Sequence, residues 1–170
     1  MDLEALFLWP AAVEPMIAQL ASRIEQYEPA LVSGPLVEGA FSALSVARML
    51  GVQFVYTERS RAEKEGLYPY VYRLPRVLVP HVRDKRVVVV NDVISAGSAV
   101  RGTIMELENH GASVVAIGAL LILGEWTRRF AAEKSIAVQA LAESSFELWS
   151  PDSCPLCQKR IPLQRRIQST

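Results

Sequence analysis

The segment from Arg86 to Glu108, RVVVVNDVISAGSAVRGTIMELE, constrains the fold more than any other part of the chain. It opens with Val87 to Val90, an unbroken β-branched run that is typical of a strand buried on both faces. Two polar residues, Asn91 and Asp92, follow at the carboxyl end of this strand, and the short turn Ser95-Ala96-Gly97-Ser98 comes next. Apolar residues at three- and four-residue spacing then indicate a helix: Val100, Ile104 and Leu107. The segment therefore predicts a strand, a turn and a helix in succession.

This predicted junction has the features of an anion-binding site. Backbone N–H groups at a helix N-terminus point towards the preceding turn, and the helix dipole favours negative charge there. The hydroxyls of Ser95 and Ser98 add donors, while the Asp92 carboxylate is placed to reach sugar hydroxyls or a metal ion. A phosphate on one side and hydroxyls on the other describe a ribose 5-phosphate. The simpler alternative is an ordinary strand-to-helix junction in which Ser98 is the N-cap and Gly97 eases the turn.

The thirteen residues from Val87 to Ala99, VVVVNDVISAGSA, resemble the diphosphoribose-binding signature of the type I phosphoribosyltransferases. That signature is a hydrophobic strand, two acidic residues, two apolar or small positions and then Thr/Ser-x-Gly-Thr/Ser. The resemblance implies an α/β fold: a central, mainly parallel sheet flanked by helices, with a small hood formed by the N- and C-terminal segments. It also implies that the chain binds 5-phosphoribosyl 1-diphosphate and a nucleobase, with Mg²⁺ held mainly through the substrate.

The same resemblance assigns roles to individual residues. The 5-phosphate is expected to bind the hydroxyls and backbone amides of five residues: Ser95, Ala96, Gly97, Ser98 and Ala99. Asp92 is expected to be catalytic, to accept hydrogen bonds from ribose hydroxyls and to be the candidate protein ligand of Mg²⁺. Asn91 departs from the signature, because the family usually carries an acidic residue there. An amide oxygen still accepts a hydrogen bond but carries no charge, so we expect substrate binding to be weaker by about tenfold.

A glycine-bracketed loop precedes the main segment. Gly34 and Gly39 lie between a brief predicted strand from Ala30 to Ser33 and a predicted helix from Phe41 to Leu50. Glycines allow backbone amides to approach an anion closely. In the family the first such loop binds pyrophosphate, which implies substrate-binding roles for Gly34, Pro35, Glu38 and Gly39. A plain turn between a strand and a helix is the alternative.

A charged segment follows the predicted strand from Val52 to Thr57. In the family the loop at this place is a mobile flap whose basic residues close over pyrophosphate and exclude water. The resemblance therefore assigns a catalytic role to Arg59 and substrate contacts to Arg61 and Lys64. The segment lacks the Lys-x-His-Gly pattern that is typical of orotate enzymes, and a solvated loop is the alternative.

Two apolar stretches after the flap, Leu67 to Tyr72 and Arg76 to Val79, are interpreted as a two-stranded arm. The flanking prolines, Pro75 and Pro80, restrict the pairing of these strands to sheet edges. Family members are commonly homodimers, and an exposed apolar arm would suit a homodimer.

Base recognition is where the chain departs most from orotate enzymes. Those enzymes commonly place an Asp-Arg pair at the end of the strand predicted here from Ser113 to Leu123, where the arginine helps to hold the base. This chain has Gly124-Glu125-Trp126 at that point instead. Arg128 or Arg129 would be a substitute, although both are equally typical of a helix surface.

The only two cysteines lie in the tail, in Cys154-Pro155-Leu156-Cys157. Such a pair supplies half of a tetrahedral zinc site, which a second subunit would complete. Ordinary free thiols and a redox-active pair are the alternatives. Together with the following Ile161-Pro162-Leu163, the pair resembles the C-terminus of a bacterial subgroup of orotate phosphoribosyltransferases.

Length and composition indicate one globular domain. The chain has 170 residues, 51% of them hydrophobic, which suffices for a single core. Hydrophobic strands alternate with helical segments, which predicts a parallel sheet with right-handed crossovers. We expect residues 1–170 to form one domain, with a core at about 29–142 and a hood from about 1–28 and 143–170.

Charge and hydropathy argue against several classes of protein. Eighteen basic and eighteen acidic residues cancel, so no net field favours nucleic acid or an anionic membrane. The longest apolar run, Val114 to Gly124, has about half the length needed to cross a bilayer. The N-terminus lacks the basic region of a signal peptide, and two cysteines do not make a disulfide framework. A cytoplasmic location is therefore expected.

These observations lead to one principal function and two alternatives. The chain is expected to transfer ribose 5-phosphate from 5-phosphoribosyl 1-diphosphate to a nucleobase, with orotate as the first choice, giving orotidine 5′-phosphate and diphosphate. A purine or uracil is an alternative acceptor, because base contacts come from the variable hood. The other alternative is a non-catalytic regulator of nucleotide metabolism that binds the same diphosphate.

Overall fold

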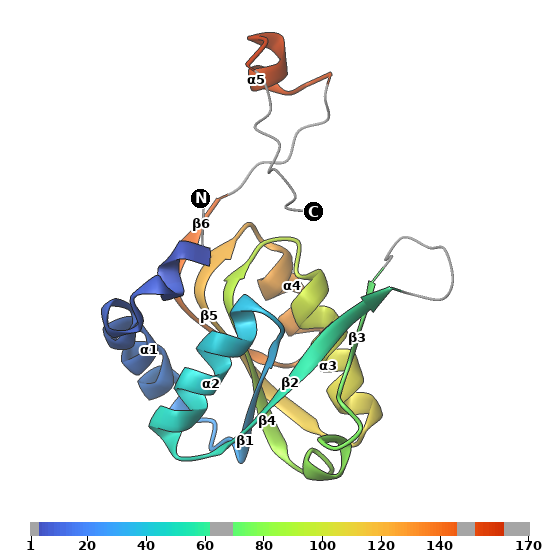
Figure 1. The fold of residues 1–170 in the computed structure, drawn as a ribbon. Coiled ribbons are helices and arrows are strands. Elements are labelled where there is room, and N and C mark those ends of the chain that lie inside the picture. Colours follow the sequence, from blue (N-terminus) through green and yellow to red (C-terminus); the bar gives the residue numbers. More distant parts are fainter. Residues whose placement is uncertain (1–3, 62–69, 146–151, 162–170) are drawn as a thin grey trace.

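The computed structural model describes residues 4–61, 70–145 and 152–161. Its centre is a six-stranded sheet in the order β3-β2-β1-β4-β5-β6, with helices on both faces (Figure 1). The strands are β1 (Leu31–Pro35), β2 (Gln53–Arg61), β3 (Tyr70–Arg73), β4 (Arg86–Ile94), β5 (Ser113–Leu123) and β6 (Ala137–Ser144). All neighbours pair in parallel except β3, which pairs antiparallel with β2 at one edge. The predicted mainly parallel α/β fold is confirmed.

Two helices cover each face of the sheet. The helices α1 (Pro10–Glu25) and α2 (Glu38–Leu50) pack on one face, and α3 (Ser98–Asn109) and α4 (Trp126–Lys134) pack on the other. The short helices are η1 (Glu4–Leu8), η2 (Val79–His81) and α5 (Pro155–Gln158). Within the described ranges, none of the helices is long and apolar enough to span a membrane. The division of the chain into a core and a hood stays a prediction.

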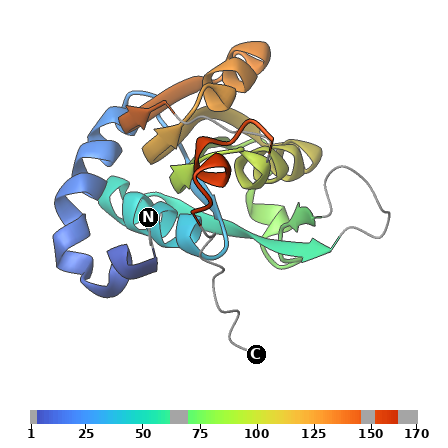
Figure 2. The ribbon, with the colours of Figure 1, turned by 90° about the horizontal axis from the view of Figure 1, so that it is seen from above.

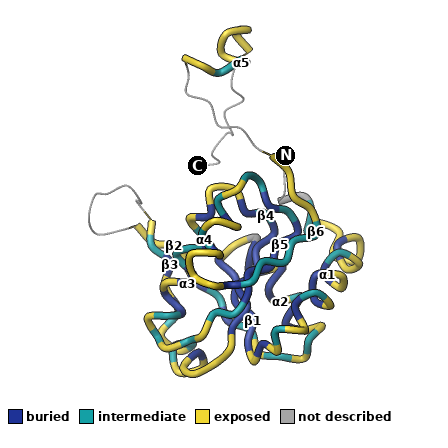
Figure 3. The backbone as a smooth tube through the Cα atoms, turned by 180° about the vertical axis from the view of Figure 1, so that it is seen from behind, coloured by how far each residue is buried: buried dark blue, intermediate teal, exposed yellow. Residues whose placement is uncertain are grey.

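The strand β4 lies at the centre of the core, as its β-branched run predicts. Val87 and Val89 belong to the hydrophobic cluster that packs under α3, whereas Val88 and Val90 belong to the cluster under α1 and α2. All four side chains are fully buried, and Figure 3 shows the buried strands running through the middle of the molecule. Burying one such side chain contributes about 1.5–3 kcal/mol. The strand that carries Asn91 and Asp92 is therefore held firmly from both sides.

The helix α3 is fixed against the β2–β3 edge by polar and close contacts. The buried Glu106 carboxylate accepts hydrogen bonds from Arg73 Nη1 at 2.8 Å and from the Leu74 backbone N–H at 3.1 Å. Burial opposes ionisation of Glu106, but these two bonds and the charges of Arg73 and His110 outweigh it and lower the pKa of the carboxyl. Gly102 allows the Tyr72 ring to pack directly on the helix, since a Cβ there would lie 2.5 Å from the ring. These contacts hold α3 against β3 and the residue that follows it.

Two predicted element boundaries are wrong. Residues Glu58 to Arg61 are not a loop, because β2 continues through them and pairs with β3. Residues Arg76 to Val79 are not a strand: Leu78 N–H donates to the Pro75 carbonyl at 2.8 Å, and the chain turns there before η2. Of the two prolines that flank this segment, Pro75 is the first residue of the turn and Pro80 lies in η2.

Candidate substrate-binding site

The candidate site lies where the parallel strands end at their carboxyl termini, the edge seen from above in Figure 2. A cavity of about 180 Å³ at the end of β4 is lined by Asn91, Val93, Ile94, Ser95, Ala96, Gly97, Ser98, Ala99 and Val100. Six of these nine residues are those predicted from the sequence to bind the sugar phosphate: Asn91, Ser95, Ala96, Gly97, Ser98 and Ala99. The structure thus gathers six of the residues predicted to bind the ribose 5-phosphate around one cavity.

The turn between β4 and α3 presents backbone and hydroxyl donors to this cavity. Gly97 is the N-cap of α3 and has a left-handed φ of 72°, so the alternative with Ser98 as N-cap is wrong. Gly97 has no side chain that could form a capping hydrogen bond to the α3 N-terminus. The first N–H groups of a helix have no partner inside the helix, and an anion can accept from them. Ser95 and Ser98 are both exposed beside them.

Asn91 connects this turn with the first predicted loop. Its Nδ2 atom donates to the Val93 carbonyl at 2.9 Å, and its Oδ1 atom lies so close to Gly39 that a Cβ on that glycine would be 2.1 Å away. A Cβ on Gly34 would in turn lie 2.5 Å from the Gly39 carbonyl oxygen. Both glycines are therefore required by close packing between β1, β4 and α2, and the two predicted loops meet at Asn91.

The first loop is shorter than the sequence predicts. Gly34 and Pro35 end β1, and α2 begins at Glu38, so that only Leu36 and Val37 connect the two elements. Leu36 N–H donates to the Thr57 carbonyl of β2 at 2.8 Å, which holds the connection along the sheet edge. Gly39 thus lies in the first turn of α2, where its backbone contributes to a second helix N-terminus at the same edge.

Asp92 follows Asn91 on β4 and is 6% exposed. It is outside the lining of the 180 Å³ cavity, next to Val93, which belongs to that lining. Its predicted roles in catalysis and in metal binding stay predictions.

The basic residues that were assigned to a flap are on a strand. Arg59 and Arg61 belong to β2 and pair with Tyr72 and Tyr70 of β3. The Arg59 guanidinium lies 4.6 Å from the centroid of the Tyr70 ring, a cation–π contact. Both arginines are exposed and lie outside the cavity lining, and Lys64 falls outside the described residues. Their predicted contacts with pyrophosphate stay predictions.

Trp126 contacts the turn that lines the cavity, and the sequence did not reveal this contact. It begins α4, directly after the strand next to β4. A Cβ on Gly97 would lie 1.8 Å from the Trp126 ring, so the indole packs onto the turn that lines the cavity. The strand order places the end of β5 beside the end of β4, but the sequence carries no signal for this particular side-chain contact.

The two arginines considered for base binding lie on the outer part of α4. Arg128 Nε donates to Glu143 Oε2 at 3.0 Å, and a second bond joins Arg128 Nη2 and Glu143 Oε1. The hydrogen bonds between them raise the pKa of Arg128 and lower the pKa of Glu143. Arg129 is exposed. Arg128 is thus engaged with β6.

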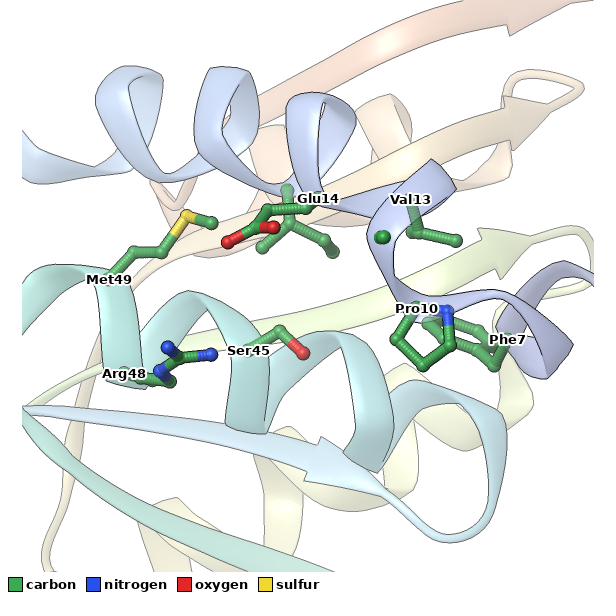
Figure 4. A pocket seen from close by; sticks show the side chains of 9 residues that line it. Phe7, Pro10, Val13, Glu14, Ser45, Arg48 and Met49 are labelled. Carbon is green, nitrogen blue, oxygen red and sulfur yellow. The ribbon is translucent and has the colours of Figure 1, made fainter.

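A second cavity, of about 190 Å³, lies between α1 and α2 (Figure 4). It is lined by Phe7, Pro10, Ala11, Val13, Glu14, Ile17, Ser45, Arg48 and Met49. Figure 4 shows Glu14 and Arg48 pointing into the same space from the two helices. Its lining contains none of the predicted site residues. Exposed apolar side chains lie nearby: Trp9, directly before α1, is 75% exposed, and Leu44 of α2 is 51% exposed. The homodimer stays a prediction.

The two cysteines are close together at α5. Hydrogen bonds from the Cys157 backbone N–H, the Cys157 thiol and the Leu156 N–H lower the pKa of Cys154, whereas the bond between the thiols raises the pKa of Cys157. Among the residues that the structure describes, no third His, Cys, Asp or Glu lies near enough to form a metal site with them. Zinc at Cys154 and Cys157 stays a prediction.

Comparison with known proteins identifies the family. The model of the phosphoribosyl transferase domain matches residues 3–143. The chain belongs to the phosphoribosyl transferase domain family. A relative named orotate phosphoribosyltransferase, from Desulforamulus reducens, is 31% identical over 153 residues, which cover 90% of this chain and 73% of the relative. Another of that name, from Thermotoga maritima, is 27% identical over 160 residues, covering 94% of this chain and 79% of the relative.

Solved structures of the phosphoribosyltransferase fold superimpose on this chain. The adenine phosphoribosyltransferase of Thermoanaerobacter pseudethanolicus matches with a TM-score of 0.69 and 21% identity, covering 84% of this chain and 86% of that one. The orotate phosphoribosyltransferase of Aeropyrum pernix matches with a TM-score of 0.67 and 20% identity, covering 84% of this chain and 77% of that one. At these identities the likeness establishes the fold and leaves the acceptor base open.

Proposed function

We propose that this phosphoribosyltransferase transfers ribose 5-phosphate from 5-phosphoribosyl 1-diphosphate to orotate, releasing diphosphate. The main support for 5-phosphoribosyl 1-diphosphate as the donor is the cavity at the end of β4. Six of the residues that the sequence predicts to bind the ribose 5-phosphate line it. Orotate as the acceptor is supported by the names of the relatives from Desulforamulus and Thermotoga.

The 5-phosphate would bind at the N-terminus of α3. The hydroxyls of Ser95 and Ser98 and the first N–H groups of the helix donate to its oxygens, and the helix dipole stabilises its negative charge. Anchoring this remote group fixes the position of the ribose C1 atom. Asp92 and the Asn91 amide, directly before the turn on β4, accept hydrogen bonds from the ribose hydroxyls.

The diphosphate would leave towards the β1–α2 connection. Gly39 brings its backbone close to Asn91 there, and Gly34 packs against Gly39. The N-terminus of α2 adds a second favourable dipole. Arg59, Arg61 and Lys64, on and beyond β2, would neutralise part of the developing charge when the donor binds. These residues act on the leaving group and need no contact with the acceptor.

Magnesium fits the chemistry of the site. The Asp92 carboxylate and the Asn91 amide oxygen are hard oxygen donors of the kind that Mg²⁺ prefers, and this ion usually keeps several waters and binds substrate oxygens. When bound with the donor, Mg²⁺ would neutralise charge on the diphosphate.

Pyrophosphate release tests the proposal. The purified chain is incubated with 5-phosphoribosyl 1-diphosphate and Mg²⁺, and with orotate, uracil, adenine, guanine or hypoxanthine in turn. We expect release with orotate at least tenfold faster than with any other base. Faster release with a purine or with uracil would contradict orotate as the acceptor. Measurable donor binding without turnover on any base would contradict an enzyme and support the regulator.

A further inference from the structure

The buried state of Gly97 is unusual for its position in the turn. Its neighbours Ser95, Ala96 and Ser98 are exposed, whereas Gly97 is buried although it lines the cavity. The Trp126 indole explains this difference, because three of its ring atoms would lie 1.8–2.5 Å from a Cβ on Gly97. The ring thus occupies the space that any other side chain at position 97 would need.

Trp126 is itself fixed by its surroundings. Gly124, with a left-handed φ of 77°, turns the chain after β5 and donates its N–H to the Ser144 carbonyl of β6 at 2.9 Å. Trp126 then starts α4 and stacks on Phe130 one turn later, with ring centroids 4.8 Å apart and an interplanar angle of 14°. Both rings pack against the buried cluster that contains Val100 and Ile104 of α3. The indole therefore contacts the β4–α3 turn from a rigid neighbouring element.

We propose that Trp126 is a positioning residue of the donor site, holding Gly97 and the surrounding turn in the conformation that binds the 5-phosphate. The inference rests on the proposed function and deepens it. A turn that is already ordered loses less conformational freedom when its ligand binds, so the ligand binds more tightly. Because Gly97 is the N-cap of α3, a shift of Gly97 would re-aim the N–H groups of the helix N-terminus.

The first experiment compares Trp126→Ala, Trp126→Phe and the wild-type protein in the pyrophosphate-release assay. For Trp126→Ala we expect the KM for the donor to rise about tenfold, while kcat and the KM for the base change by less than about threefold, because such a residue acts on donor binding. Trp126→Phe should show a much smaller rise in the donor KM than Trp126→Ala, since phenylalanine retains an aromatic ring. Trp9→Phe, at a side chain that is 75% exposed, is the control. Equal donor KM values in all variants would overturn the inference.

A double mutant separates steric contact from general destabilisation. Gly97→Ala alone places a methyl group inside the indole, so donor binding should fall by more than about 100-fold. Adding Trp126→Ala removes the clash but leaves the strain of an alanine at a positive φ. The double mutant should therefore bind the donor at least fivefold better than Gly97→Ala. If the two losses simply multiply, Trp126 does not act through Gly97.

Intrinsic fluorescence gives a readout that a purely structural tryptophan would not change. In a variant with Trp9→Phe and Trp149→Phe, Trp126 is the only tryptophan, and its emission is followed during titration with ribose 5-phosphate. We expect a saturable change in emission that is lost with Asp92→Ala. Unchanged emission during binding that calorimetry detects would overturn the inference and leave the proposed function standing. Failure of the wild-type protein to bind ribose 5-phosphate or the diphosphate would instead contradict the proposed function.

Discussion

The proposed donor side and the proposed acceptor side of the candidate site are built differently. On the donor side, the β4–α3 turn uses backbone N–H groups, small residues and glycines that are required by close packing. At the end of β5, where the resemblance places base recognition, the chain has Gly124-Glu125 instead of an Asp-Arg pair, and the nearby Arg128 is bound to Glu143. A site made of backbone groups requires a particular short sequence, because the local backbone conformation must be right. A site made of side chains can be formed by residues from different helices and strands. The sequence therefore identifies the sugar donor more sharply than the base.

Replacing Asp92 should have the largest effect on activity, because its carboxylate is proposed to bind the ribose of the donor. For Asp92→Ala we expect kcat/KM to fall by about 10²–10³-fold or more, the size seen when one stabilising polar group is removed from an active site. The exposed Glu133 on α4 provides the control, and Glu133→Ala should leave kcat/KM unchanged. Steady-state pyrophosphate release measures both variants. Near-normal activity of Asp92→Ala would place the donor elsewhere.

Replacing Glu106 tests whether the support of α3 can be weakened without loss of the site. For Glu106→Gln at pH 7 we expect a loss of about 1–2 kcal/mol of stability, because the hydrogen bonds to a charged acceptor weaken, with the donor Kd within about threefold. Glu108→Gln is the matched control: Glu108 pairs with Lys134 at the surface, and such pairs contribute about 0–1 kcal/mol. Thermal denaturation and calorimetry measure the two quantities.

The stability difference between wild type and Glu106→Gln should depend on pH, because the pKa of Glu106 is lowered in the folded protein. A carboxyl whose pKa is lower in the folded state contributes its full stability above its unfolded pKa, about 4.3, and loses it as the pH falls through the folded pKa. The difference in Tm between wild type and Glu106→Gln should therefore shrink as the pH falls below about 4. A difference that grows on acidification would contradict this assignment.

Replacing Asn91 by the acidic residue that is usual in the family should tighten donor binding and lower the stability of the protein. Asn91→Asp adds a negative charge next to Asp92, and we expect donor binding in the presence of Mg²⁺ to tighten by up to about tenfold. A carboxylate cannot donate to the Val93 carbonyl as the amide does, so stability should fall by about 1 kcal/mol. Titration calorimetry and thermal denaturation measure the two effects. Unchanged or weaker donor binding would contradict the first expectation.

Replacing Arg128 should have the smallest effect, and it tests the acceptor side. Its guanidinium is bound to Glu143 on β6, so we expect Arg128→Ala to change the KM for orotate by less than about twofold. Glu143→Gln, which breaks the same pair from the other side, should behave alike. A tenfold rise in the KM for orotate with Arg128→Ala alone would show that Arg128 binds the base, and the contrast between the two sides would then fail.

The parts of the fold that were predictable depend on local patterns. The run Val87 to Val90 predicts the central strand because burial on both faces selects such residues, and the strand from Ser113 to Leu123 is found with its predicted bounds. The charges of the segment from Glu58 to Arg61 predict a loop. It is a strand because antiparallel pairing with β3 satisfies its backbone, and an exposed edge ribbon tolerates charged side chains.

In the candidate site, too, features that depend on local sequence could be predicted, and contacts between distant residues could not. The cavity lined by Ser95 to Ala99 follows from a short contiguous motif. The contact between Asn91 and Gly39, and that between Trp126 and Gly97, join residues that are distant in the chain. Such contacts depend on the strand order and on the angle at which each helix crosses the sheet, and a single sequence specifies neither directly.

Calorimetric titration with 5-phosphoribosyl 1-diphosphate in the presence of Mg²⁺ tests most directly whether the β4–α3 turn is the donor site. Wild type, Asp92→Ala and Glu133→Ala are compared at one pH and one ionic strength. We predict one donor bound per chain for wild type and Glu133→Ala, and binding at least 100-fold weaker for Asp92→Ala. Equal binding by all three proteins, or absence of binding by the wild type, would contradict a donor site at the end of β4.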